Sequence, residues 1–322
     1  MNDEDARPPA ACTEHPDRAD RIAPPMVRAE FDSLVPPASA DRPDGRRGFL
    51  AGAVGAGFAA AVAPTGALRA QVIRTDTQGL TAGEVRIPVK DGQMAAYRAQ
   101  PTGRTNLATV LVVHEIFGVH EHIQDLCRRL AKAGYLALAP QLFARQGDPS
   151  RYTTVAEIAS EIVSKVSDAQ VMADLDVAAA WAGANGGDAG KLGITGFCWG
   201  GRIVWMYSAH QPRLKAGVAW YGRLTTSVTR ETPTHPHDVA EKLNAPVLGL
   251  HGGDDPGIPL QTVEDMRTRL SFGGKASEAS EIVVYPDAPH AFNADYRPSY
   301  RKAAADDGWK RMQAWFARWG VA

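Results

Sequence analysis

A cysteine in a glycine-rich bend is the residue of this sequence best suited to covalent chemistry. Cys198 lies at the centre of GFCWG, residues 196–200, between a segment typical of a strand and a segment typical of a helix. The glycines permit a tight turn, and the free N–H groups at the start of the helix favour a thiolate. This pattern predicts that Cys198 is a nucleophile. The alternative is a buried cysteine that only fills a bend.

A nucleophile of this kind needs a general base, and the base needs a group that orients it. Two later segments supply these residue types, each directly after an apolar run. HGGDDPGIP offers Asp254 and Asp255, and DAPHAF offers His290. The order of nucleophile, carboxylate and histidine predicts an acyl-transfer site. A histidine that only braces its loop is the alternative for His290.

Strand-like and helix-like segments alternate from residue 84 onward and would position these side chains. A hairpin is expected within 83–101, with its turn at Asp91 and Gly92. Further strands are expected at 108–118, 135–143, 191–197, 215–222, 245–255 and 280–292. Helices are expected at 122–134, within 155–184 as one or two helices, at 202–210 and at 309–319. The alternation predicts one α/β domain, 71–322, with a doubly wound, mostly parallel sheet and its site at the carboxyl ends of the strands.

The composition excludes several other classes of protein. The 322 residues are 44% hydrophobic and carry a formal net charge of −1. The chain therefore lacks the excess of positive charge that binding to nucleic acid or an anionic membrane requires. Three cysteines, Cys12, Cys127 and Cys198, are too few for a disulfide framework or a zinc cluster. Cys127 is interpreted as a small buried helical side chain, with a bridge to Cys198 as the alternative. HPHD, residues 235–238, offers no third metal ligand, so no metal or organic cofactor is expected.

The first seventy residues differ in composition from the rest of the chain. Residues 1–45 are rich in Pro, Ala, Asp and Arg and are predicted to be disordered. In 46–70, Arg46 and Arg47 are followed by the pair Phe49-Leu50 and by an apolar run of Gly, Ala and Val. This arrangement resembles a twin-arginine export signal. We therefore expect transport by the twin-arginine export machinery, to the periplasm in a bacterium. A membrane anchor, or a linker in a cytoplasmic protein, is the alternative.

From 84 to 319 the chain resembles the dienelactone hydrolases, or carboxymethylenebutenolidases, a family with the α/β-hydrolase fold. The family's G-x-C-x-G elbow stands here as GFCWG, its GG-x-D-x-x-x-P stretch as GGDDPGIP, and its histidine motif as APHAF. The resemblance implies a catalytic triad of Cys198, Asp255 and His290. It selects Asp255 over its neighbour because Pro259 follows four residues later.

The resemblance also implies roles for residues that spacing alone does not single out. Glu115, in HEIFG, matches a glutamate that contacts the thiol and takes its proton when substrate binds; a loop-bracing carboxylate is the alternative. Arg145, in LFARQ, matches an arginine that binds the substrate carboxylate. The family's second arginine lies four residues after the histidine, where this chain has Ala294. Arg297 is close enough in sequence to substitute for it.

Three further positions complete the expected site. The backbone amides of Trp199, in the elbow, and Ile116, after the third strand, are expected to form the oxyanion hole. Tyr221, at the end of the strand expected at 215–222, occupies a family position that lines the pocket. Core packing is the alternative role for Tyr221.

The implied reaction is hydrolysis of a small-molecule ester or enol-lactone, with a thiol ester on Cys198 that water activated by His290 releases. The enolate leaving group of a dienelactone suits a thiol, and slow turnover is expected on simple alkyl esters. One alternative is a general carboxylesterase or thioesterase of the same fold, acting on substrates without a free carboxylate. Another is a non-catalytic or redox-sensing protein, because an exposed thiol of low pKa can respond to oxidants. No second cysteine is placed as a resolving partner, which disfavours the sensor.

Overall fold

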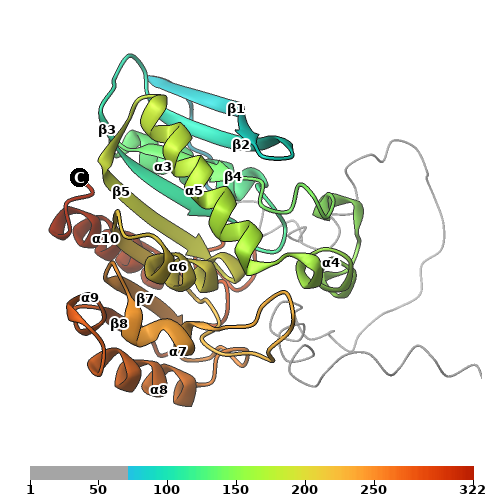
Figure 1. Cartoon of the computed structure of the whole chain (residues 1–322), viewed down its shortest axis with the longest axis vertical. Helices are drawn as coiled ribbons and strands as arrows, with labels where there is room; N and C mark the ends of the chain where they lie inside the picture. Colours follow the sequence, from blue (N-terminus) through green and yellow to red (C-terminus); the bar gives the residue numbers. More distant parts are fainter. Residues whose placement is uncertain (1–71) are drawn as a thin grey trace, which may run out of the picture.

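The computed structural model describes residues 72–322, so the segments 1–45 and 46–70 discussed above lie outside the described residues. Within 72–322 a twisted sheet runs through the molecule with helices on both of its faces (Figure 1). No helix in this range is long and apolar enough to cross a bilayer. The expected hairpin and the alternation of strands and helices are both present.

The sheet has eight strands in the order β1-β2-β4-β3-β5-β6-β7-β8. The hairpin strands are antiparallel to each other, β2 is antiparallel to β4, and every other pair is parallel. The fold class is therefore the predicted one, an α/β-hydrolase fold with a mostly parallel, doubly wound sheet. The strands are β1 Leu80–Val89, β2 Gly92–Pro101, β3 Leu107–Val113, β4 Leu136–Pro140, β5 Gly187–Phe197, β6 Leu214–Trp220, β7 Val247–Gly252 and β8 Glu281–Tyr285.

The central strands are buried on both faces because helices cover the sheet on each side. All residues of β3 and β4 are buried, which explains why these strands read as continuous apolar runs without alternation. The edge strands β1 and β8 are only partly buried. The core of the molecule therefore lies along the middle of the sheet, and its central strands carry the candidate site at their carboxyl ends.

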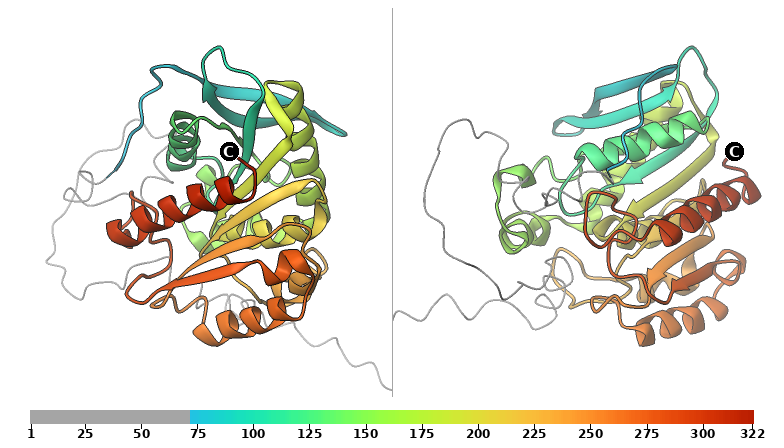
Figure 2. Two further views of the ribbon diagram at one scale, coloured as in Figure 1. Left: turned by 90° about the vertical axis from the view of Figure 1, so that its left-hand side faces the viewer. Right: turned by 180° about the vertical axis from the view of Figure 1, so that it is seen from behind.

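Helices α3 and α10 cover one face of the sheet, and α5, α6 and α8 cover the other (Figure 2). The region 155–184 forms two helices, as one of the two expectations had it. Helix α8 was not among the helices expected from the sequence, although its buried residues Val263, Met266 and Leu270 have helical spacing. The helices are α3 Glu121–Lys132, α4 Val155–Glu161, α5 Asp168–Ala184, α6 Trp199–His210, α7 Pro236–Val239, α8 Leu260–Ser271, α9 Lys275–Glu278 and α10 Lys302–Arg318.

The residues expected to do chemistry follow the carboxyl ends of five parallel strands. They leave β3, β5, β6, β7 and β8 at the same edge of the sheet, which is where ligands bind in folds of this type. In strand order these residues are Glu115, Cys198, Tyr221, Asp255 and His290.

Candidate active site

Cys198 occupies a strained turn between β5 and α6. Its backbone has φ 56° and ψ −115°, in the left-handed region that residues other than glycine rarely adopt. A Cβ atom on Gly196 would overlap the carbonyl oxygen of Gly200, and one on Gly200 would overlap the carbonyl oxygen of Val113. The glycines of GFCWG are therefore required by the close approach of α6 to β5 and β3. The turn holds the cysteine at the start of α6, where only 4% of it is exposed.

Asp255 and His290 meet across the loops that follow β7 and β8. Nδ1 of His290 donates a hydrogen bond to Oδ2 of Asp255 over 2.7 Å, and both side chains are buried. The N–H of Gly257 donates to the other carboxylate oxygen, Oδ1, over 2.9 Å. This pairing fixes the proton on Nδ1 and leaves Nε2 of His290 as the nitrogen available to another group.

The third member of the expected triad lies close to that histidine. Burial by itself would lower the pKa of His290, but the negative charges of Asp255 and the Cys198 thiolate raise the pKa well above its usual value. Within 72–322, Nε2 of His290 has no partner that satisfies hydrogen-bond geometry. The imidazole is thus held by Asp255 through Nδ1, and Cys198 is near enough to affect its protonation.

The two residues expected to supply the oxyanion hole are Trp199, at the start of α6, and Ile116, in the loop after β3. Trp199 is the first residue of α6, so its N–H has no acceptor within the helix. Ile116 is buried in the loop after β3. That loop is braced by His114, whose Nδ1 donates to the carbonyl oxygen of Glu115 over 2.6 Å and whose Nε2 accepts from the N–H of Leu142 over 3.2 Å. Burial lowers the pKa of His114 to about 4, so the ring is neutral and can make both contacts.

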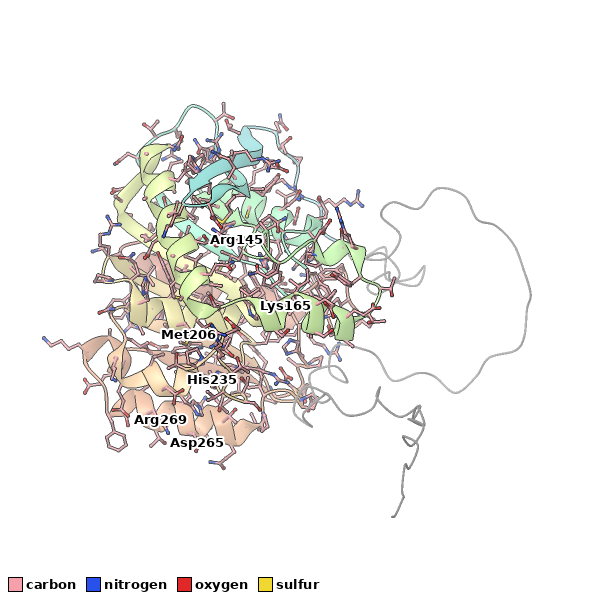
Figure 3. The ribbon with its side chains drawn as sticks, turned by 45° about the vertical axis from the view of Figure 1, so that its right-hand side comes forward. Arg145, Lys165, Met206, His235, Asp265 and Arg269 are labelled. Atoms are coloured by element: carbon pink, nitrogen blue, oxygen red, sulfur yellow. The ribbon has the colours of Figure 1, made fainter. Side chains whose placement is uncertain are left out.

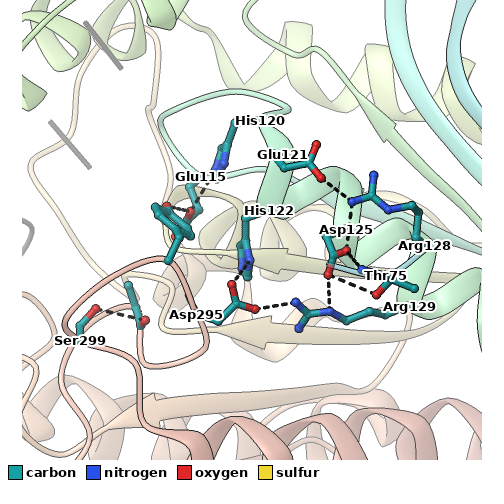
Figure 4. A network of polar contacts seen from close by, with 12 residues as sticks. Thr75, Glu115, His120, Glu121, His122, Asp125, Arg128, Arg129, Asp295 and Ser299 are labelled. Atoms are coloured by element: carbon teal, nitrogen blue, oxygen red, sulfur yellow. Dashed lines mark hydrogen bonds and ion pairs between the residues drawn. The ribbon is translucent and has the colours of Figure 1, made fainter. Parts of the chain in front are cut away.

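Glu115 is buried, but its carboxylate is bound by residues other than the cysteine (Figure 4). The hydroxyl of Tyr296 donates to Oε2 over 2.7 Å, and Nε2 of His120 lies 3.3 Å from the same oxygen. No hydrogen bond joins Glu115 to Cys198 in the described part of the chain. The expected contact between Glu115 and the thiol is therefore absent, because Tyr296 and His120 already bind the carboxylate.

The surroundings of Glu115 favour its ionised form. Burial by itself would raise its pKa, but the hydrogen bond from His120 and the nearby positive charge of Arg297 bring the pKa below its usual range. Burial lowers the pKa of His120 more than Glu115 raises it. A neutral His120 that donates its Nε2–H to an ionised Glu115 accounts for both directions.

The two candidate substrate arginines have different surroundings. Arg145, labelled in Figure 3, donates to Asp91 over 2.5 and 2.8 Å and to Asp174 over 2.6 and 3.0 Å. These contacts join the turn between β1 and β2 to α5. Its guanidinium therefore already binds two carboxylates. Arg297 is 6% exposed and lies 5.4 Å from the ring centre of Phe117. It is close enough to lower the pKa of Glu115, so it lies in the site.

Tyr221 borders the histidine of the site. Its ring centre lies 5.2 Å from that of His290 and 5.2 Å from that of Phe292, each with edge-on geometry. Its backbone has φ 38°, a second strained residue that is not glycine. Its hydroxyl is buried with no hydrogen-bond partner among residues 72–322. The ring packs in the core while the hydroxyl stays available, so both roles considered for this tyrosine are compatible with its position.

Other expectations concern residues outside this cluster. Cys127 is buried in α3, and both it and Cys198 are free thiols, so the alternative of a bridge between them is wrong. Within 72–322 no group of three or more His, Cys, Asp or Glu could hold a metal ion. A surface cavity of about 370 Å³ lies along α8, lined by Asp265, Arg269 and Phe272 among others; Cys198 and His290 do not line it.

The residues that surround Glu115 were not among the site residues expected from the sequence. His120 and His122 lie 5 and 7 positions after it in EIFGVHEH, and Tyr296 follows His290 in the same loop. The ring of Tyr296 lies 5.2 Å from that of His120 and 5.1 Å from that of His122. The two closely spaced histidines were the signal, but nothing in the spacing pairs them with a tyrosine so far along the chain.

Comparison with known proteins fits this arrangement of a cysteine elbow, an aspartate and a histidine on an α/β-hydrolase sheet. The model of the dienelactone hydrolase family matches residues 94–320. The chain belongs to the dienelactone hydrolase family. Proteins of this family are hydrolases that act on esters and lactones, and the chain is an enzyme of that class.

Relatives of known sequence and structure agree with membership of the dienelactone hydrolase family. A protein of Methylorubrum extorquens named "Putative carboxymethylenebutenolidase" is 55% identical over 91% of this chain and 99% of its own length. A protein of Escherichia coli with the same name is 53% identical over 82% of this chain and 96% of its own. The crystal structure of a Klebsiella pneumoniae protein titled "Putative Dienelactone Hydrolase" is 58% identical, with a TM-score of 0.72, over 74% of this chain and 99% of that one.

Proposed function

We propose that this chain hydrolyses an enol-lactone or related ester through a Cys198 nucleophile in a triad with His290 and Asp255. The observation that carries the proposal is the 2.7 Å hydrogen bond from Nδ1 of His290 to Asp255, with Cys198 close enough to raise the pKa of the imidazole. Nucleophile, base and orienting carboxylate then have the arrangement that acyl transfer requires.

The reaction follows from these positions. Nε2 of His290 takes the thiol proton, and the thiolate attacks the carbonyl carbon. The oxyanion that forms accepts hydrogen bonds from the amides of Trp199 and Ile116. The carbon–oxygen bond to the enolate breaks, the leaving enolate takes the proton from His290, and the ring-opened acyl group stays on Cys198 as a thiol ester. His290, neutral again, deprotonates a water molecule, and the hydroxide attacks the thiol ester. The carbon–sulfur bond breaks, the carboxylate product leaves, and His290 returns its proton to the sulfur.

For the substrate we propose a small ester or lactone that carries a carboxylate. The positive charge and burial of Arg297 beside Glu115 support this, because a guanidinium in a low-dielectric site binds a carboxylate strongly. Arg145 stays a second candidate, although it would have to exchange a contact with Asp91 or Asp174 for the substrate. Tyr221 would border the bound substrate, since its ring packs against that of His290 and its hydroxyl has no hydrogen-bond partner among residues 72–322.

A general esterase or thioesterase is the second candidate function. The observation in its favour is that Arg145, the arginine carried over from the family pattern, is already paired with two carboxylates. A neutral substrate would need no arginine to bind a carboxylate.

We also propose that the chain is exported by the twin-arginine machinery, which the Arg46–Arg47 pair and the apolar run after it support.

Hydrolysis assays on the full chain test the proposal. We expect fast loss of a dienelactone, slower loss of a neutral aryl ester, and no turnover of either by Cys198→Ala. Cys127→Ala is the matched control, since Cys127 is a buried cysteine in α3, and we expect it to keep full activity. Turnover of the aryl ester alone would favour the general esterase. Dienelactone turnover that survives Cys198→Ala would contradict the cysteine mechanism.

A further inference from the structure

Arg297 lies in a tight turn of the loop after β8. Its N–H donates to the carbonyl oxygen of Ala294 over 2.9 Å, which closes a turn over residues 294–297, the arginine turn. The first and last residues of such a turn have Cα atoms within about 7 Å of each other. The turn therefore brings Arg297 back beside Ala294, the position where the family pattern has its second substrate arginine.

The two central residues of the arginine turn are buried and bound by side chains of other elements. Oδ2 of Asp295 accepts from Nη2 of Arg129 in α3 over 2.5 Å, and Oδ1 lies 3.5 Å from Nδ1 of His122 (Figure 4). The hydroxyl of Tyr296 donates to Glu115, in the loop after β3, over 2.7 Å. The turn is therefore tied to α3 through Asp295 and to the loop after β3 through Tyr296.

Arg129 is itself fixed on its helix. Its Nε donates to Asp125 over 2.6 Å, and Asp125 also accepts from Arg128 over 3.0 Å and from the N–H of Thr75 over 2.6 Å. The side chain of Arg129 is 17% exposed and that of Asp295 is 1% exposed. An ion pair with so little water around it is screened weakly and holds its geometry better than an exposed pair. The contact between Asp295 and Arg129 is therefore a firm link between the turn and α3.

The guanidinium of Arg297 packs against two aromatic rings. Its central carbon lies 5.4 Å from the ring centre of Phe117 and 5.9 Å from that of Tyr296. Phe117 follows Ile116, one of the two residues expected to bind the oxyanion, and Tyr296 belongs to the arginine turn. The charge of Arg297 therefore lies near the expected oxyanion hole, and its direction depends on where the turn is held.

We propose that Asp295 is a positioning residue, which through Arg129 of α3 fixes the arginine turn so that Arg297 can bind the carboxylate of the substrate. This inference rests on the proposed function and specifies it further, because it traces the preference for a carboxylate to a contact on α3. Asp295 itself does not touch the substrate. Its loss weakens binding of the carboxylate and leaves the chemistry at Cys198 unchanged.

Steady-state kinetics on the full chain test the positioning role with two esters that share a leaving group, one with a carboxylate and one neutral. In Asp295→Asn we expect KM for the charged ester to rise about tenfold, the effect of a lost charged hydrogen bond, with kcat nearly unchanged. Both constants for the neutral ester should stay at the wild-type values. Damage to the fold would affect both esters, so an equal loss on the two would overturn the proposal.

Asp307→Asn is the matched control for these kinetics. Asp307 also accepts from an arginine, Arg311, over 2.6 Å, but both residues lie on α10. The control should leave KM and kcat unchanged for both esters. A rise of KM for the charged ester equal to that in Asp295→Asn would show that the loss of any paired carboxylate has this effect, which would overturn the proposal.

Calorimetric titration with 2-furoate, a five-membered oxygen ring that carries one carboxylate, measures the same binding without turnover. Asp295→Asn and Arg297→Ala should each raise Kd about tenfold, and the double variant should bind no more weakly than Arg297→Ala alone. Arg129→Gln removes the same contact from the side of α3 and provides a second variant with the same expected effect. Furfuryl alcohol, the neutral counterpart, should show no difference between the proteins.

Failure of this inference is separable from failure of the proposed function. Binding of 2-furoate that weakens in Asp295→Asn only while Arg297 is present would support the positioning role, even if hydrolysis survived in Cys198→Ala. Cys198-dependent hydrolysis with unchanged 2-furoate binding in both Asp295→Asn and Arg129→Gln would keep the proposed function and overturn the positioning role. Absence of 2-furoate binding to the wild-type chain, or an equal weakening with and without Arg297, would overturn it as well.

Discussion

At the scale of single residues, the two arginines differ in where they lie. Arg145 makes four hydrogen bonds to two carboxylates, one of them on the buried Asp174. Arg297 lies over Phe117 and beside Glu115, within the candidate site. Arg145 therefore has the surroundings of a structural residue, whereas Arg297 lies where the proposed substrate carboxylate would bind.

Replacing each arginine by alanine should separate these roles. Arg145→Ala leaves Asp174 buried without its partner, so we expect the free energy of unfolding to fall by about 1–3 kcal/mol. The preference for a carboxylate-bearing ester over a neutral one should be kept. Arg297→Ala should raise KM for the charged ester at least about tenfold, the effect of losing a charged hydrogen bond. Denaturation curves measure the loss of stability, and steady-state kinetics with both esters measure the preference. If only Arg145→Ala lost the preference for the charged ester, Arg145 rather than Arg297 would be the arginine that binds the substrate carboxylate.

The neighbouring aspartates after β7 offer a second residue-scale prediction. Asp255 holds Nδ1 of His290, whereas Asp254 is exposed. Asp255→Asn presents an amide that can hold the imidazole in the wrong tautomer, and we expect kcat to fall by about 10²–10⁴-fold, as in other triads. Asp254→Asn is the matched control and should keep kcat near the wild-type value. Equal loss in the two variants would contradict the assignment of the orienting carboxylate.

At the scale of elements, the elbow depends on how closely α6 approaches β5. Gly196 has no room for a Cβ because the carbonyl oxygen of Gly200 lies in its place, and that oxygen belongs to the helix backbone. Gly274, at the start of α9, has φ −77° and nothing within 4 Å of an added Cβ. The two glycines thus differ in packing rather than in backbone conformation.

Gly196→Ala should lower the free energy of unfolding by about 1–3 kcal/mol, because α6 must move away from β5 to admit the methyl group. It should also lower activity, since the same movement displaces Cys198 and the Trp199 amide. Gly274→Ala should be neutral or stabilising by about 0.4–1 kcal/mol, because it restricts the unfolded chain without a clash. Urea denaturation of both variants decides the matter, and a stable, active Gly196→Ala protein would refute the packing argument.

At the scale of the whole molecule, buried histidines couple folding to pH. Burial lowers the pKa of His114 and of His251 to about 4. The unfolded chain binds protons at these histidines below about pH 6.5, while the folded chain does not until about pH 4. Stability is therefore fully present above pH 6.5 and is lost as the pH falls toward 4, by up to about 3 kcal/mol for each histidine.

Thermal unfolding at a series of pH values checks this expectation. The melting temperature should fall between pH 7 and pH 5, before most carboxylates are protonated. His251→Leu removes two buried ring nitrogens that have no hydrogen-bond partner among residues 72–322, and it should make the pH dependence shallower. A melting temperature that is flat from pH 7 to pH 5, or a slope unchanged in His251→Leu, would show that these histidines do not control it.

The sequence alone determined the fold class and the family of this chain, because both depend on local patterns. Alternating apolar segments predict the parallel sheet, and each glycine-flanked motif directly follows its strand. The strand expected at 108–118 ends earlier, at Val113, since the chain must leave the sheet there to present Glu115 and the amide of Ile116. Local pattern also placed Cys198 in its bend, whose positive φ is a property of that turn.

Only the tertiary structure decided what surrounds Glu115 and which arginine lies beside it. The hydrogen bond from Tyr296 to Glu115 joins residues 181 positions apart, and the one from Arg145 to Asp91 joins residues 54 apart. Hydrophobic periodicity sets the direction of a strand, but it carries no information on which polar side chains meet where separate loops converge. That pairing depends on loop paths, and here α3 sets the path by anchoring the loop after β8 through Arg129 and Asp295.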